Sequence, residues 1–136
     1  MSYELREHTA DIAVEASGET FAAVASAVAD GLAAAMCESV PAAGDRFELS
    51  VTAESREALL FEYLDELIYE RDVRSVLPVD NEATITKGDG DWTIEGSARG
   101  VPLSAVTARE IKAVTYSEMA VEERDGEWYA YVVFDV

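Results

Sequence analysis

Apolar positions spaced three and four residues apart predict two helical segments in this chain. The first is expected over residues 21–38, where the apolar side chains follow this spacing and residues 18–20 provide a start. The second begins after Ser55, which can cap it, and carries one apolar stripe with acidic residues on the opposite side. That stripe consists of Leu59, Leu60, Tyr63, Leu64, Leu67 and Ile68. The two segments are therefore predicted to be amphipathic helices.

Most of the remaining chain alternates between apolar and polar residues, which is typical of β-strands. The expected strands cover residues 3–6, 12–16, 46–53, 74–80, 82–88, 91–98, 111–124 and 127–136. Turns are expected at a Gly-Asp-Gly sequence and at Asp125–Gly126. Both faces of the last strand are apolar, which favours a central strand covered on both sides.

These elements predict an α+β fold. Helices and strands do not alternate regularly, and the hairpin signals imply antiparallel pairing. A length of 136 residues fits one domain, expected over residues 1–136, and no internal repeat is visible. We expect a mostly antiparallel or mixed sheet with two main helices packed on it.

The charge of the chain is strongly negative, with 28 acidic residues against 10 basic ones and a net charge of −18. Such a field repels nucleic acid phosphate, so strong direct nucleic-acid binding is not expected. Two explanations compete: binding of a basic partner or of cations, and adaptation of the whole protein to high salt. The second is favoured because the acidic residues are spread over all predicted helices and turns.

A cytoplasmic location is expected from the absence of secretory and membrane signals. The single cysteine, Cys37, cannot form an internal disulfide, and the sequence contains neither a signal-peptide pattern nor a long apolar stretch.

Several chemistries are disfavoured by residue counts. The chain has one histidine and one cysteine, which cannot complete a zinc shell of nitrogen and sulfur ligands, and it has no Gly-x-Ser-x-Gly sequence for a nucleophilic serine. The glycines of GDGDWTIEG stand beside acids, which do not suit a phosphate-binding loop. Hard cations with oxygen ligands remain as candidates.

Two aspartates stand out as candidate cation ligands. Asp11 lies at the edge of an apolar strand, and Asp135 follows the run AYVVF, where the terminal carboxylate of Val136 adds further oxygens. A carboxylate at the end of a central strand is costly to desolvate unless it is paired, hydrogen-bonded or bound to metal. Residue types alone leave open that each aspartate caps a turn or meets an arginine. His8 can equally be a turn residue, and Lys112 an exposed strand lysine or the partner of a carboxylate.

Three sequences carry a resemblance to a known family: EHTADIAV near the amino terminus, IKAVTYSEMAV about a hundred residues later, and WYAYVVFDV at the carboxyl end. Together with the acidic segment LLFEYLDELIYERD between them, they resemble the archease family across the whole chain. The resemblance implies a small α+β protein, not itself an enzyme, that assists the GTP-dependent tRNA-splicing ligase of the RtcB type. It further implies that the protein promotes guanylylation and repeated turnover of that ligase.

The resemblance also implies a divalent cation, commonly calcium, with Asp11, Asp135 and Val136 as its ligands and His8 and Lys112 as supporting residues. One departure concerns the lysine motif, in which Ser117 stands where the family usually has histidine. A serine cannot titrate near neutrality or supply a nitrogen ligand, so an all-oxygen site is the one that remains. An alternative function is a chaperone-like modulator of a tRNA-modifying enzyme such as a methyltransferase. A small metal-dependent hydrolase is disfavoured because no general base accompanies the aspartates.

Overall fold

A computed structural model describes residues 2–8 and 11–136, with the side chains of residues 2 and 5–8 left undescribed. Two α-helices, one short 3-10 helix and seven β-strands make up this part of the chain. The strands are β1 (Ser2–His8), β2 (Asp11–Gly18), β3 (Asp45–Ala53), β4 (Val76–Lys87), β5 (Trp92–Pro102), β6 (Ala113–Arg124) and β7 (Glu127–Asp135). The helices are α1 (Phe21–Met36) and α2 (Arg56–Arg74), and the 3-10 helix η1 covers Leu103–Ala105.

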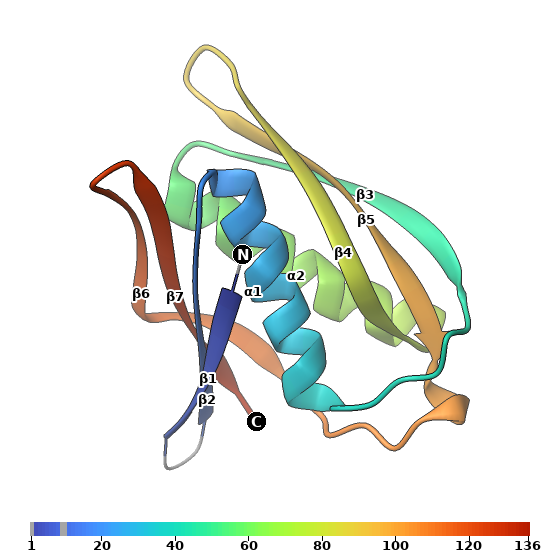
Figure 1. Cartoon of the computed structure of the whole chain (residues 1–136). Helices are drawn as coiled ribbons and strands as arrows, with labels where there is room; N and C mark the ends of the chain where they lie inside the picture. The colour runs from blue at the N-terminus through green and yellow to red at the C-terminus, as the bar shows by residue number, and fades with distance from the viewer. Residues whose placement is uncertain (1, 9–10) are drawn as a thin grey trace.

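The strands form two separate antiparallel sheets with the helices between them (Figure 1). One sheet has the order β1-β2-β7-β6, and the other has the order β3-β5-β4. Each helix contacts strands of both sheets, so the apolar core is continuous from one sheet through the helices to the other. The predicted α+β class is confirmed, with the strands divided between two sheets.

Helix α1 begins where the sequence supplies a cap and packs closely on β2. The hydroxyl of Thr20 accepts a hydrogen bond from the amide of Ala23 at 3.0 Å. Gly31 faces the sheet, where a Cβ atom would lie 2.6 Å from Cγ1 of Val14. A side chain at this position would therefore push the helix away from the strand.

Helix α2 matches the predicted amphipathic segment. Ser55 caps it by accepting a hydrogen bond from the amide of Ala58 at 3.1 Å, and Ser75 ends it in a left-handed conformation with φ of 55°. All six residues of the predicted apolar stripe are buried. The same buried side also contains Arg71, which is 7% exposed.

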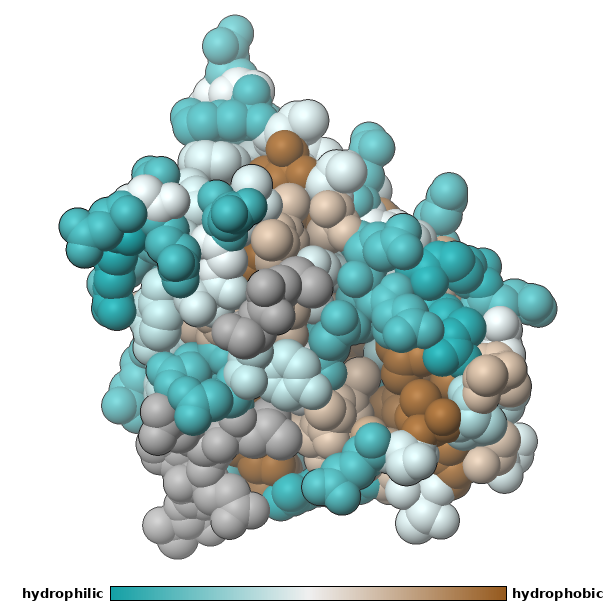
Figure 2. Space-filling view, viewed as in Figure 1, coloured by the Kyte–Doolittle hydropathy of each residue, from teal (hydrophilic) through white to brown (hydrophobic). Residues whose placement is uncertain are grey.

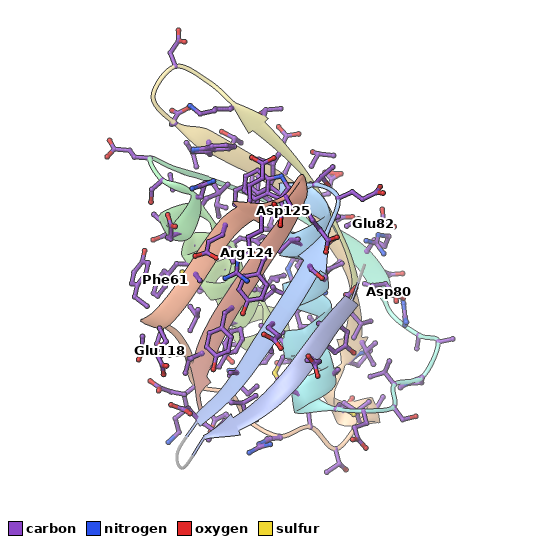
Figure 3. The ribbon with its side chains drawn as sticks, turned by 60° about the vertical axis from the view of Figure 1, so that its left-hand side comes forward. Phe61, Asp80, Glu82, Glu118, Arg124 and Asp125 are labelled. Carbon is purple, nitrogen blue, oxygen red and sulfur yellow. The ribbon has the colours of Figure 1, made fainter. Side chains whose placement is uncertain are left out.

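The last strand, β7, lies between β2 and β6 and is therefore an interior strand, as predicted. Its Ala130, Val132 and Phe134 are fully buried on the side that faces the helices. The expectation that both faces are covered holds only in part, because on the other, outer face Val133 is buried whereas Tyr129 and Tyr131 are half-buried. Figure 3 shows this outer face toward the viewer.

Two predicted strands, 74–80 and 82–88, are one continuous strand, β4, with a bulge between Val79 and Glu82. The bulge is fixed by contacts from distant parts of the chain. The amide of Asn81 donates to Oδ1 of Asp30 in α1 at 2.9 Å, and Arg99 in β5 donates to Asp80 at 2.9 Å. Local sequence could not reveal these partners.

Hydrophilic side chains cover much of the surface in Figure 2, including the β4–β5 hairpin that projects at the top of the view. Among the described helices, none is long and apolar enough to cross a bilayer.

Candidate metal centre

Asp11 and Asp135 lie directly opposite each other at one end of the four-stranded sheet. They are cross-strand partners in the antiparallel pairing of β2 with β7, although 124 positions separate them in the chain. Directly opposite residues of antiparallel strands have Cβ atoms roughly 4.5–5.5 Å apart on the same face of the sheet. The structure therefore brings together the two aspartates that the sequence set apart.

The pair occupies the outer face of the sheet. The residues that alternate with them, Ile12 and Phe134, are buried toward the helices, so Asp11 and Asp135 point the other way. The next partners on the outer face, Ala13 and Val133, are also buried, at 0% and 2% exposure. Asp11 is half-buried with its Oδ1 atom enclosed, whereas Asp135 is exposed. One carboxylate thus lies at an apolar patch and the other lies open to solvent.

Two like charges directly opposite on a sheet destabilise the pairing of the strands. A divalent cation between the carboxylates replaces this repulsion with attraction, and hard cations such as Ca²⁺ prefer oxygen ligands of this kind. The arrangement of Asp11 and Asp135 consequently fits a cation that is bound at the end of the sheet and remains accessible from outside.

Three other predicted site residues lie around the pair. His8 is the cross-strand partner of Asp11 on β1, which places it in the same row of the sheet, but its side chain is outside the described residues. Val136 follows Asp135 directly, and its side chain packs against the core, which anchors the carboxyl end of the chain. Lys112 lies just before β6, exposed, and its amide donates to the backbone oxygen of Asp135 at 2.8 Å.

The segment that carries Lys112 is held by both helices. The amide of Arg109 donates to the backbone oxygen of Met36 at the end of α1 at 2.7 Å. Nη1 of Arg71 on α2 donates to the backbone oxygen of Ile111 at 2.7 Å. The helices thereby fix the position of residues 109–112 against the end of β7.

Arg71 was not identified by the sequence analysis. Besides Ile111, it contacts the sulfur of Met36 at 3.4 Å, and it pairs with Asp72 at 3.0 Å. A signal was present, because Arg71 follows Leu64 and Leu67 at the spacing of the apolar stripe, where a charged residue must find buried partners.

Ser117, which replaces the usual histidine of the family motif, lies away from the aspartate pair. It is exposed within the irregular part of β6, between Thr115 and Ala120, where its amide donates to Oγ1 of Thr115 at 3.2 Å. Within the described side chains, no three His, Cys, Asp or Glu residues form a group that could hold a metal. Among the described side chains, the candidate donors that the fold brings together are the two paired aspartates.

The protein has two larger cavities, of which one borders the aspartate pair and the other lies on the three-stranded sheet. One cavity of about 560 Å³ lies between the end of α1 and residues 107–109, with Ile12 in its wall next to Asp11. A larger cavity of about 850 Å³ lies on the three-stranded sheet, where Glu48, Glu82 and Glu95 line it.

Comparison with known proteins decides the family. The model of the archease protein family matches residues 3–136. The chain belongs to the archease family. The archease of Pyrococcus furiosus is 33% identical over 144 residues, with 98% of each chain covered. The archease of Methanosarcina mazei is 34% identical over 139 residues, covering 98% of this chain and 95% of its own.

Solved structures agree with this membership. The solution structure of a Methanobacterium thermoautotrophicum protein superposes with a TM-score of 0.84 at 29% identity, covering 98% of both chains. The crystal structure of an archease from Thermotoga maritima, described as a possible chaperone, gives a TM-score of 0.63 at 22% identity over 98% of this chain and 96% of its own. The latter likeness supports the archease fold alone. The resemblance expected from the sequence is thus confirmed for the family and the fold.

Proposed function

We propose that this archease-family protein is a cation-binding accessory protein of the cytoplasmic, GTP-dependent tRNA-splicing ligase of the RtcB type. In this role it promotes guanylylation of the ligase and its repeated turnover, and has no enzymatic activity of its own. The observation that carries the proposal is the direct pairing of Asp11 with Asp135 at the end of the sheet.

The cation in this proposal is divalent, with calcium as the first candidate. Calcium takes six to eight oxygen ligands, and Asp11, Asp135 and the Val136 carboxylate supply about three if each binds through one oxygen and about six only if each binds through both. The remaining positions are open to water or to groups of a partner. When bound, the cation supplies a positive centre that can orient anionic groups beside the exposed Asp135.

The proposed partner is a protein because the charge of −18 opposes close approach of RNA. A negative surface suits docking on a basic protein surface and raises the local concentration of cations. The alternative is that this protein acts as a chaperone-like modulator of a tRNA-modifying enzyme such as a methyltransferase. The archease of Thermotoga maritima is described as a possible chaperone, which is compatible with such a role.

The first test combines cation affinity with thermal unfolding. In Asp11→Asn and Asp135→Asn, calcium affinity measured by titration calorimetry is expected to fall at least about tenfold, because each variant removes one charged ligand. Calcium at a hundred times the wild-type dissociation constant stabilises the wild type by about 2.7 kcal/mol, and at the same concentration this gain is expected to fall to about 1.4 kcal/mol or less in both variants. Asp89→Asn, in the distant β4–β5 turn, is the control for loss of one charge.

The second test measures ligase guanylylation with defined metals at the salt concentration of the host. The wild type is expected to accelerate it, and Asp11→Asn and Asp135→Asn to lose most of the acceleration while Asp89→Asn keeps it. Unchanged guanylylation with either aspartate variant contradicts the assignment of the site, and unchanged calcium affinity in both contradicts the metal. Acceleration of a tRNA methyltransferase but not of the ligase supports the alternative partner.

A further inference from the structure

The exposed side of α2 carries an unusual row of apolar and acidic residues. Phe61, Asp65, Tyr69 and Val73 follow one another at four-residue steps, which places them along one line of the helix surface. Tyr69 and Val73 are 57% and 61% exposed. Tyr116 of β6, 52% exposed, extends the row because its ring stacks on Phe61 with centroids 4.1 Å apart and planes 5° apart. We refer to these five residues as the α2 face.

Most of the exposed large apolar side chains among the described residues lie on the α2 face. Four large apolar side chains are classed as exposed in the described part of the chain, and three of them, Tyr69, Val73 and Tyr116, belong to this face. Figure 3 shows Phe61 at the margin of the four-stranded sheet, beside β6, with Glu118 on the same side. Exposed aromatic and aliphatic residues gathered on one surface mark an interaction site more often than scattered ones do.

Acidic residues frame this apolar row. Glu62 and Asp72 are exposed on either side of it, and Asp65 lies within it. These three acidic residues, the acidic frame, favour some kinds of binding partner over others. A second copy of the chain would bring another charge of −18 to the same surface, and RNA would bring phosphates, so repulsion opposes both. A protein surface with lysine or arginine around an apolar recess complements the face in both charge and polarity.

From this complementarity we infer that the α2 face is the docking surface for a partner protein with a basic rim and an apolar centre. The inference rests on the proposed function in one respect, because it takes the ligase as the partner to be tested.

The α2 face connects directly to the aspartate pair through the fold. Arg71, on the buried side of the same helix, holds Ile111, and the adjacent Lys112 holds the backbone of Asp135. The helix that carries the α2 face on its exposed side therefore holds, from its buried side, the segment that borders the candidate metal centre. Docking and cation binding use different residues, so each can be removed while the other is retained.

The test measures binding of the full-length protein to the purified RtcB-type ligase of the same organism by titration calorimetry. The double variant Tyr69→Ser with Val73→Ser is expected to weaken binding at least about tenfold, since exposed aromatic anchors dominate interface affinity. Both side chains are more than half exposed, so folding is expected to be retained. Tyr3→Ser removes an exposed aromatic from β1, outside the face, and is expected to leave binding unchanged.

A charge-matched pair tests the acidic frame. Asp65→Lys and Asp89→Lys both change the net charge from −18 to −16, but only Asp65 lies on the α2 face. Asp65→Lys is expected to slow association several-fold and to flatten its dependence on salt, whereas Asp89→Lys retains wild-type behaviour. Calcium affinity is expected to be unchanged in all of these variants.

The outcomes separate the two proposals. Loss of binding confined to the α2-face variants, with calcium affinity retained, supports the inference. Wild-type binding by these variants overturns the inference and leaves the proposed function standing. A wild-type protein that neither binds the ligase nor accelerates guanylylation overturns the proposed function and this docking partner together.

Discussion

At the scale of single residues, Arg71 joins the helices to the carboxylate pair. Its guanidinium is buried, and it donates to the backbone oxygen of Ile111, which no other described hydrogen bond satisfies. Ile111 in turn precedes Lys112, whose amide holds the backbone of Asp135. The backbone of Asp135, a proposed cation ligand, is therefore held by a segment that Arg71, in the last turn of α2, fixes in place.

Replacement of Arg71 by methionine tests this connection. Arg71→Met leaves the buried oxygen of Ile111 without its donor, which is expected to lower the free energy of unfolding by about 2 kcal/mol. Calcium affinity is expected to fall several-fold because residues 109–112 are less firmly held. Chemical denaturation and titration calorimetry measure the two effects.

Arg74→Met, three residues along the same helix, is the matched control. Arg74 is 46% exposed and pairs with Glu70, so its loss is expected to cost about 0.5 kcal/mol and to leave calcium affinity unchanged. Equal effects of the two variants on stability and affinity would show that Arg71 has no special role.

At the scale of elements, the sequence predicted those parts of the fold that depend on neighbouring residues. Helix α2 was predicted well because Ser55 caps it and its apolar stripe is regular. The strands were located, but their division into two sheets was not predicted, because strand pairing is non-local. Asp11 and Asp135 were recognised from their unusual positions in the sequence. Their direct opposition in the sheet results from the pairing of β2 with β7, which local sequence does not specify. Arg71 and the Phe61–Tyr116 stack were missed because their partners lie more than 35 residues away.

Crowded carboxylates along α2 make the helix sensitive to pH. Burial, a hydrogen bond with Glu70, and the charges of Glu70, Asp65 and Glu62 raise the pKa of Glu66 from 4.5 to about 6. A carboxyl whose pKa is raised by folding contributes stability below its unfolded pKa and loses it as the pH rises through the folded value. The contribution of Glu66 is therefore present below pH 4.5 and lost by about pH 6.

Glu66→Gln removes this titration. At pH 7 the variant is expected to be more stable than the wild type by about 1 kcal/mol or less, because a neutral amide avoids the repulsion that solvent partly screens. The difference is expected to shrink as the pH falls from 7 to 4.5. Unfolding curves across this range measure it, with Glu54→Gln, before α2, as the control. A difference independent of pH would contradict the role of Glu66.

At the scale of the whole molecule, the net charge of −18 sets the response to salt. Exposed acids repel one another over the Debye length, which shrinks from about 10 Å at 0.1 M to about 3 Å at 1 M salt. The thermal midpoint of unfolding is therefore expected to rise between 0.1 M and 1 M potassium chloride. Chloride is chosen because sulfate stabilises proteins through exclusion from their surface.

A variant with less charge provides the comparison. Glu48, Glu82 and Glu95 line the concave surface of the three-stranded sheet, and changing all three to glutamine reduces the net charge from −18 to −15. The rise in midpoint with salt is expected to be smaller in this variant than in the wild type. A midpoint that does not change with salt in either protein would contradict adaptation to high salt.

The interior position of β7 has a consequence for how the protein is made. Strands β1 and β2 leave the ribosome first and β7 last among the strands described, yet β7 separates β2 from β6. During synthesis, the β1–β2 hairpin therefore has one unpaired edge, along β2, until β7 has been made. The four-stranded sheet therefore cannot be completed before β7 has been synthesised, and until then the unpaired edge of β2 is open to pairing with another chain.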